Sequence, residues 1–227
     1  MAENAVGIIV GAGPGLGNAL VDRFAVGGLA VATVTRKGLA PELQKRDAVV
    51  RGYACDATDT GQVRTMFARV TAELGPPELV VFNVGTWDRA GILEISDELF
   101  VRAWRTGCFG GFLVGRAAAE AMLPRGRGTI IFTGATGSLR GGAGFAAFAV
   151  PKFGLRALAQ SMARELGPKG IHVAHVLIDG MIAAPGDTPR EGYMKPDEIA
   201  EAYYQLHRQQ RSAWTHELDL RPSAEKF

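Results

Sequence analysis

The feature that most constrains the fold is a regular alternation of short apolar runs with amphipathic helical stretches along the 227 residues. The apolar runs, expected to form strands, cover residues 6–10, 29–34, 48–54, 79–82, 129–132, 172–178 and 215–220. A first helix carries Leu16, Ala19, Leu20 and Phe24 at helical spacing, and further helices are expected over 61–74, 97–122, 147–167 and 196–210. Strands that alternate with helices and are apolar throughout are typical of a parallel sheet buried on both faces. We therefore expect an α/β fold with a doubly wound, mostly parallel seven-stranded sheet and helices on both faces.

Length and composition fit one domain over residues 1–227, since 47% hydrophobic content is enough for a sizeable core. The net charge is +2, from 25 basic and 23 acidic side chains, and the cations are scattered rather than striped. No nucleic-acid partner is therefore expected. Residues 179–196, rich in Gly and Pro, are expected to form a loop over the carboxyl edge of the sheet, where ligands of open α/β sheets bind.

Other sequence features bear on location and on metals. Two cysteines, Cys55 and Cys108, give no disulfide framework. No run of 18 apolar residues could cross a bilayer, and the N-terminus lacks the pattern of a signal peptide, so a cytoplasmic protein without membrane contact is expected. His172 and His175 lie three apart in an expected strand and should face opposite ways, so no metal site is expected.

A glycine-rich turn follows the first expected strand directly and opens the first expected helix. Gly11, Gly15 and Gly17 have the spacing G-x-x-x-G-x-G, in which Leu16 occupies the last glycine place of the commoner G-x-G-x-x-G pattern. Glycines let the backbone make tight turns and approach a pyrophosphate, and the free N–H groups at a helix start attract anions. The turn therefore predicts a dinucleotide site, although a turn without a ligand is the simpler alternative.

The end of the second strand indicates which dinucleotide binds. An acidic residue about 20 positions after the glycines would bind the ribose 2′-hydroxyl of NAD, but the sequence there is Thr35-Arg36-Lys37. Two adjacent cations suit a 2′-phosphate. NADP(H) is therefore favoured over NAD(H), unless Arg36 and Lys37 are ordinary surface residues.

Together with Lys152, which follows Phe148 by four positions, the glycine turn resembles the short-chain dehydrogenase/reductase family. The resemblance spans the chain from Val6 to about Leu220 and implies a Rossmann-type fold. It also implies that Asp56 contacts the adenine and that Asn83 stabilises a strand end beside the cofactor. The cofactor-binding residues expected on these grounds are Gly11, Gly13, Gly15, Leu16, Gly17, Thr35, Arg36, Lys37, Asp56, Ala57, Asn83, Val84, Gly85, Lys152, Gly180 and Ile182.

In that family a Tyr-x-x-x-Lys motif drives proton transfer, with a Ser and an Asn as helpers. Here the Tyr position holds Phe148, the Ser position Ala135 and the Asn position Gly107, so only Lys152 remains. A phenyl ring neither gives nor takes a proton, and loss of an acid and of an oxygen-stabilising donor costs several powers of ten in rate. Ordinary carbonyl reduction should be poor without a substitute acid.

Substitute proton donors are Thr133, Thr136 or Ser138 near Ala135, or Tyr193 in the loop. Pro151 bears on whether Lys152 can reach the cofactor. In the first turn of its helix it would be harmless, whereas deeper in it would cost about 3 kcal/mol, kink the helix and turn Lys152 away from the ribose.

The vacated catalytic position is surrounded by apolar residues, which suits a flat or greasy ligand unless their side chains simply fill it. The expected walls are Ala135, Phe145, Phe148, Trp87, Met181, Ile182 and Met194. The first hypothesis is an NADP(H)-dependent oxidoreductase with a degenerate catalytic tetrad, acting on an apolar carbonyl or alcohol. The alternative is a non-catalytic NADP(H)-binding sensor or partner subunit, and a redox-neutral lyase or isomerase ranks third.

Small residues between Gly107 and Gly115 permit a close helix contact. The family resemblance implies that this helix and residues 152–167 form a dimer face, with the last strand as a second contact in a tetramer. A homodimer or homotetramer is therefore expected, with close packing inside one subunit as the alternative.

Overall fold

The computed structural model describes residues 5–38, 49–186 and 191–224. Its centre is a seven-stranded sheet in the order β3-β2-β1-β4-β5-β6-β9, in which every neighbouring pair is parallel. The strands are β1 (Val6–Val10), β2 (Ala30–Thr35), β3 (Val50–Ala54), β4 (Pro77–Phe82), β5 (Gly128–Thr133), β6 (Ile171–Ile178) and β9 (Glu217–Leu220). The fold expected from the sequence is confirmed, although residue 48 of the third expected strand lies outside the described residues.

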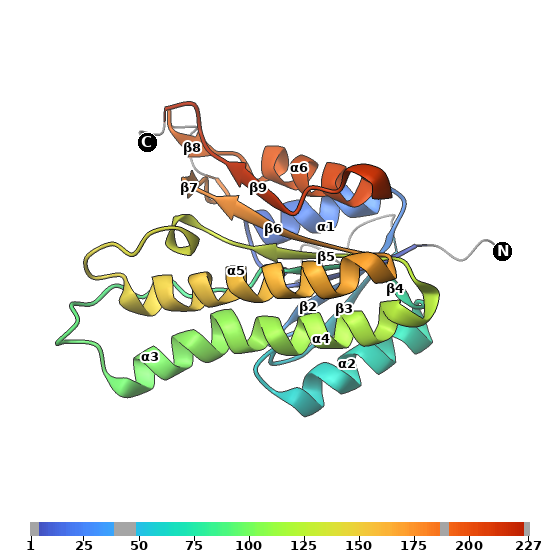
Figure 1. Ribbon diagram of the computed structural model, residues 1–227, viewed down its shortest axis with the longest axis horizontal. Helices are drawn as coiled ribbons and strands as arrows, with labels where there is room; N and C mark the ends of the chain where they lie inside the picture. Colours follow the sequence, from blue (N-terminus) through green and yellow to red (C-terminus); the bar gives the residue numbers. More distant parts are fainter. Residues whose placement is uncertain (1–4, 39–48, 187–190, 225–227) are drawn as a thin grey trace.

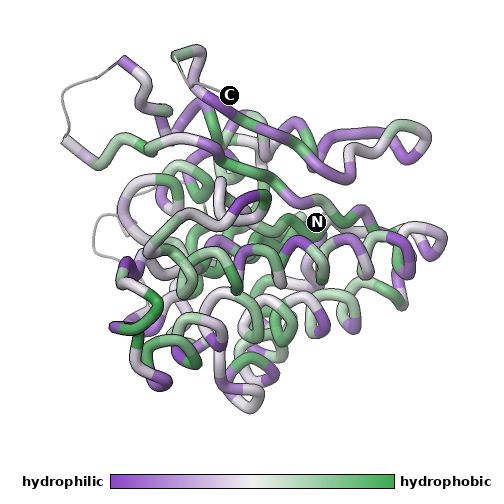
Figure 2. The backbone as a smooth tube through the Cα atoms, turned by 60° about the vertical axis from the view of Figure 1, so that its left-hand side comes forward, coloured by the Kyte–Doolittle hydropathy of each residue, from purple (hydrophilic) through white to green (hydrophobic). Residues whose placement is uncertain are grey.

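Helices cover both faces of the sheet (Figure 1). One face packs against α1 (Leu16–Val26) and α6 (Pro196–Arg208), and the other against α2 (Thr60–Glu73), α4 (Gly110–Met122) and α5 (Ala146–Leu166). The helices expected over 61–74, 147–167 and 196–210 agree with α2, α5 and α6 to within two residues at each end. Figure 2 shows hydrophobic residues in the central strands. Along the helices hydrophobic and hydrophilic residues alternate, which is the pattern of helices buried on one side.

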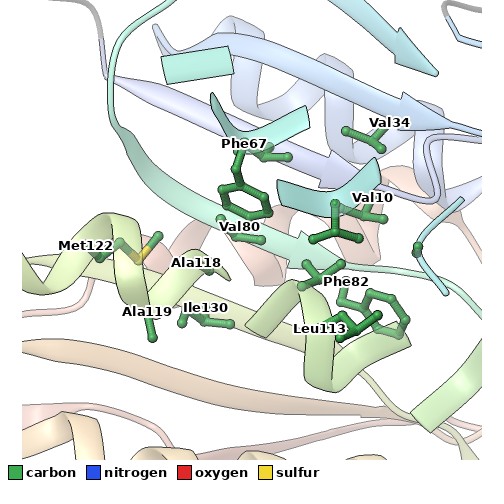
Figure 3. Packing of buried hydrophobic residues seen from close by; sticks show 14 of the residues in the cluster. Val10, Val34, Phe67, Val80, Phe82, Leu113, Ala118, Ala119, Met122 and Ile130 are labelled. Atoms are coloured by element: carbon green, nitrogen blue, oxygen red, sulfur yellow. The ribbon is translucent and has the colours of Figure 1, made fainter. Parts of the chain in front are cut away.

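The larger core cluster lies between the sheet and α2, α4 and α5. Phe67 of α2 and Leu113 of α4 reach the apolar side chains of β1, β4 and β5, of which Val10, Val80 and Phe82 are at most 2% exposed (Figure 3). Burial of each such side chain contributes about 1.5–3 kcal/mol. This packing fixes the sheet against the helices, and with it the strand ends that form the site.

The chain segment before α4 was expected to be part of one helix over 97–122. The structure has a continuous helical run there, made of α3 (Asp97–Trp104), a π-helical turn (Arg105–Phe109) and α4. Ser96 begins it by accepting a hydrogen bond from Leu99 N at 3.2 Å. A π turn admits one extra residue per turn and is found often beside functional sites.

The loop over the carboxyl edge contains a small element that the sequence did not reveal. Met181–Ile182 (β7) pairs in parallel with Tyr193–Met194 (β8). The order of the main sheet reverses between β1 and β4, so the crevice for a ligand lies at the ends of these two strands. No helix in the described part of the chain is long and apolar enough to cross a membrane.

Candidate active site

The glycine-rich turn lies at the crevice between β1 and β4. Gly11 has φ +91°, and a Cβ there would lie 2.4 Å from the Asn83 carbonyl oxygen. The side chain of Asn83 donates to the Gly11 carbonyl at 3.2 Å, and its backbone N–H donates to the Val10 carbonyl at 2.8 Å. Asn83 therefore ties the end of β4 to the turn, as a strand-stabilising residue should.

The other glycines of the turn divide into two groups. A Cβ at Gly17 would lie 2.5 Å from the Gly11 carbonyl oxygen, so a side chain at this position would push α1 off the turn. A Cβ at Gly13 or Gly15 would meet nothing within 4 Å. Packing within the described protein therefore does not require a glycine at position 13. The empty space beside Gly13 is where a pyrophosphate would approach the backbone.

A cleft of about 920 Å³ opens from this turn. Nine of the expected cofactor residues line it, namely Gly11, Gly13, Thr35, Arg36, Asp56, Ala57, Asn83, Val84 and Gly85. The other expected residues do not line it: Gly15, Leu16 and Gly17 form the start of α1, and Lys37, Lys152, Gly180 and Ile182 lie outside its walls. The nine residues that line the cleft come from the ends of β1, β2, β3 and β4 and form one continuous surface.

Two arginines of the helical run 97–109 also line the cleft and were not expected from the sequence. They are Arg102 and Arg105. Hydrogen bonds from Thr58 lower the pKa of Asp56, with smaller contributions from the charges of Arg36 and Arg105. This end of the cleft is therefore a carboxylate flanked by cations from two different elements.

Lys152 projects from α5 toward the same edge of the sheet. Its Nζ donates to the Thr133 carbonyl at 2.8 Å and would lie 3.3 Å from a Cβ at Gly85. Pro151 is the sixth residue of α5, yet the helix continues to Leu166. Pro151 thus lies beyond the first turn without ending the helix, and the Lys152 amine lies next to Gly85 in the cleft wall. Burial lowers the pKa of Lys152 to about 8.

Lys152→Met is expected to stabilise the nucleotide-free protein. The ordinary pKa of 10.5 falls to about 8 on folding, so below about pH 8 both states are protonated and the charged amine is buried at full cost. We expect the free energy of unfolding to rise by about 2–3 kcal/mol at pH 7. Between about pH 8 and 10.5 the unfolded wild type binds more protons, so wild-type stability should rise relative to Lys152→Met. Urea unfolding at pH 7 and pH 9.5 measures both, and equal stability of the two proteins at pH 7 contradicts the prediction.

The sequence resemblance aligns Phe148, Ala135 and Gly107 with the Tyr, Ser and Asn of the family pattern. Phe148 precedes Lys152 by one helical turn and is buried against Trp87, with ring centroids 4.9 Å apart. A Cβ at Gly107 would lie 2.9 Å from the Pro151 Cβ. The ring of Pro151 is rigid, so these two residues fit each other and any side chain at position 107 would force a shift.

A second pocket, of about 380 Å³, adjoins Phe148 and Ala135. Of the expected walls, Ala135, Phe145, Phe148, Trp87 and Met181 line it, whereas Ile182 and Met194 instead pack on the core beside α1 and α6. The polar residues of its wall are Thr136, Arg140 and Asp179. The pocket is therefore an aromatic box with a polar end.

The four hydroxyls considered as substitute donors lie in different surroundings. Thr133 shares a hydrogen bond with the buried Tyr203 hydroxyl at 2.9 Å, on the α6 side of the sheet. Ser138 is fully buried, and Tyr193 lies in β8 and is not part of the pocket wall. Thr136 alone among them lines the pocket, where its hydroxyl donates to the Asp179 carboxylate.

Beneath the pocket, Ser138 begins a buried polar chain. Its Oγ lies 3.3 Å from His175 Nε2, and His175 Nδ1 lies 3.4 Å from Glu217 Oε2. Arg156 holds the same carboxylate with two bonds of 2.6 Å. Burial holds the pKa of His175 well below its ordinary value, so the ring is neutral. Because Ser138 is fully buried, this series of polar contacts links β5, β6, β9 and α5 and does not reach a ligand.

Comparison with known proteins places this geometry in a family. The sequence model described as short chain dehydrogenase matches residues 5–190. The 3-oxoacyl-[acyl-carrier-protein] reductase MabA of Mycobacterium avium is 31% identical over 77% of this chain and 66% of its own length. The (3R)-3-hydroxyacyl-CoA dehydrogenase of Mus musculus is 33% identical over 81% of this chain and 76% of its own length. The chain thus spans slightly less than two thirds of the mycobacterial enzyme.

Solved structures agree with this placement. A short-chain dehydrogenase from Rhodopseudomonas palustris superimposes with a TM-score of 0.86 at 43% identity, covering 96% of this chain and 99% of the other. An alcohol dehydrogenase from Thermococcus sibiricus, complexed with 5-hydroxy-NADP, has a TM-score of 0.87 at 26% identity and 98% coverage of both. The chain therefore belongs to the short-chain dehydrogenase family of oxidoreductases, as the sequence led us to expect.

Proposed function

We propose that this protein is an NADP(H)-dependent oxidoreductase whose catalytic tetrad is reduced to Lys152. The observation that carries the proposal is the cleft at the end of β1, where Gly13 leaves open space and Arg36 stands at the wall. The bound cofactor would supply hydride transfer. The glycine turn would hold its pyrophosphate, Asp56 its adenine and Lys152 its nicotinamide ribose.

Arg36 and Lys37 support the preference for NADP(H). Arg36 lines the cleft and, within the described residues, forms no ion pair that would occupy its guanidinium. The NADP derivative in the archaeal alcohol dehydrogenase structure points the same way. A guanidinium forms a charge-assisted, bidentate hydrogen bond with phosphate, whereas its hydrogen bond with the neutral ribose hydroxyl of NAD is weaker.

Arg36→Ala should weaken NADPH binding by about 10- to 100-fold and leave NADH binding within about threefold, because one charge-assisted contact contributes about 1.5–3 kcal/mol. Lys37→Ala should give a smaller loss, since Lys37 lies outside the cleft wall. Calorimetric titration of both variants with both nucleotides measures these ratios. Arg69→Ala on α2, remote from the cleft, is the matched control. Equal losses for NADPH and NADH would exclude Arg36 as the 2′-phosphate ligand.

The substrate is proposed to be an apolar carbonyl or alcohol compound that fits the box formed by Trp87, Phe145 and Phe148. The names of the curated relatives, a 3-oxoacyl reductase and a 3-hydroxyacyl dehydrogenase, fit a carbonyl and alcohol pair. Reduction of an ordinary ketone should be slow, because Phe148 and Ala135 offer no proton.

The non-catalytic alternative rests on that same absence of a phenol. Saturable NADPH binding without turnover of any compound would favour a sensor or partner subunit. A direct test is NADPH oxidation by a benzoquinone, since hydride transfer to the quinone gives a hydroquinone anion that can take its proton from water. Consumption of NADPH with this acceptor would support the oxidoreductase.

We also propose that the protein is a homo-oligomer. Trp104 and Phe112, 40% and 38% exposed, form a stack with Phe109 on the outer side of the helical run 97–122. Phe153 of α5 is 43% exposed. Exposed aromatic rings on two adjacent helices suit contact with a second copy of the chain. Light scattering of the protein and of Phe112→Glu tests this interface.

A further inference from the structure

The polar end of the aromatic pocket has one hydroxyl bonded to one buried carboxylate. Thr136 follows β5 and is partly exposed, whereas Asp179 follows β6 and is 1% exposed. Both line the pocket beside Ala135 and Phe148, and the Thr136 hydroxyl donates to Asp179 Oδ1. The two residues therefore lie where the family pattern places its proton chemistry, although neither belongs to that pattern.

Asp179 is paired with two arginines from other elements. Arg221, just after β9, lies 2.9 Å from Oδ2, and Arg140, from the loop after β5, lies 3.4 Å away. The Asp179 backbone N–H donates to the Leu220 carbonyl at 2.9 Å, which fixes the start of the loop. Arginine stays charged throughout the ordinary pH range. Asp179 is therefore the carboxylate of this end of the pocket, and the two arginines are its charge partners.

We propose that Thr136 and Asp179 form the proton-accepting pair of this enzyme, and that its chemistry favours oxidation of an apolar secondary alcohol. The inference rests on the proposed function and names the substrate class for the same pocket. Because the single proton of Thr136 is given to Asp179, the Thr136 oxygen presents lone pairs to the pocket. An alcohol can donate to these lone pairs, whereas a ketone cannot.

The step balances as follows. The alcohol C–H bond breaks, and its electron pair leaves as hydride to the oxidised pyridine dinucleotide. The alcohol O–H proton passes to Thr136 Oγ while the Thr136 proton passes to Asp179 Oδ1, and the carbonyl double bond forms. The products are a ketone, the reduced dinucleotide and a protonated Asp179, which returns its proton to water.

Binding without nucleotide gives the first test. 1-Phenylethanol and acetophenone are titrated into the protein while the fluorescence of Trp87, which lines the pocket, is followed. We expect the alcohol to bind about three- to tenfold more tightly than the ketone, and Thr136→Val to remove the difference, because one hydrogen bond is lost. Equal binding of the two probes to the wild type overturns the proposal.

Turnover gives the second test, with NADP and 1-phenylethanol. We expect Thr136→Val and Asp179→Asn each to lower kcat by about 100-fold and Thr136→Ser to stay within about fivefold of wild type. Asp219→Asn is the matched control, since Asp219 pairs with Arg221 at 2.8 Å but lies outside the pocket wall.

The outcomes separate this inference from the proposed function. If NADPH reduces benzoquinone but no variant changes alcohol oxidation, or if 1-phenylethanol is not oxidised at all, the proton pair is refuted and the oxidoreductase stands. If NADPH does not bind, the proposed function fails by itself. Thr136→Val keeps the buried carboxylate and its arginines, so it remains a test of the pair even if Asp179→Asn does not fold.

Discussion

Gly13→Asp is expected to weaken NADPH binding by about 5- to 1,000-fold without unfolding the protein. A Cβ at this position meets no other atom within 4 Å, so the new side chain costs the free protein little. Its carboxylate would stand where the pyrophosphate approaches, and two like charges at contact distance repel by about 1–4 kcal/mol. We expect the melting temperature to change by less than about 2 °C, as for other surface substitutions. Calorimetric titration with NADPH and a thermal melt measure both effects.

Gly167→Asp is the matched control for this charge. Gly167, at the end of α5, also has no neighbour within 4 Å of an added Cβ, and it lies outside the cleft wall. It should bind NADPH as the wild type does. If Gly13→Asp also binds normally, the glycine turn is not the pyrophosphate site and the proposed function falls with it.

The double variant Phe148→Tyr with Ala135→Ser is expected to raise the NADPH-dependent reduction of acetophenone by about 100-fold. A phenol at position 148 would stand one helical turn before the Lys152 amine, whose charge favours its ionised form. General acid catalysis contributes about 10² to 10⁴ in rate. We expect the lower end, because position 107 still lacks an amide side chain.

Phe145→Tyr is the control for this gain. It places a phenol in the same pocket without the four-residue spacing from Lys152. It should leave ketone reduction unchanged, and adding Lys152→Met to the double variant should remove most of the gain. A double variant that binds NADPH and reduces no ketone would show that more than the missing acid blocks carbonyl reduction.

The fold could be predicted from the sequence because its signals are local. Each strand is a short apolar run, and β1, β2 and β6 are buried along nearly their whole length. Alternation of strand and helix then leaves a parallel, doubly wound sheet as the expected arrangement. The two-residue strands β7 and β8 escaped prediction because a ladder of two residue pairs has no periodicity to detect.

The cleft at the strand ends could be predicted in part, because several of the residues expected to bind the cofactor stand directly after strands at the crevice. Nine of them line one cleft. Arg102 and Arg105 were missed, because their approach depends on how the helical run 97–109 lies across the strand ends. Only one residue of the pair formed by Thr136 and Asp179 could be identified from the sequence. The sequence pointed to Thr136 as one of several hydroxyls, but only the tertiary fold brings it to a carboxylate 43 residues away.

The close fit of Gly107 to Pro151 restricts the order in which this active site can be rebuilt. An asparagine at position 107 would clash with a rigid ring, so it becomes acceptable only after Pro151 has been exchanged for a smaller or more yielding residue. Epistasis of this kind means that single-site libraries will score the asparagine as harmful. Libraries that vary positions 107 and 151 together are needed to find a complete relay.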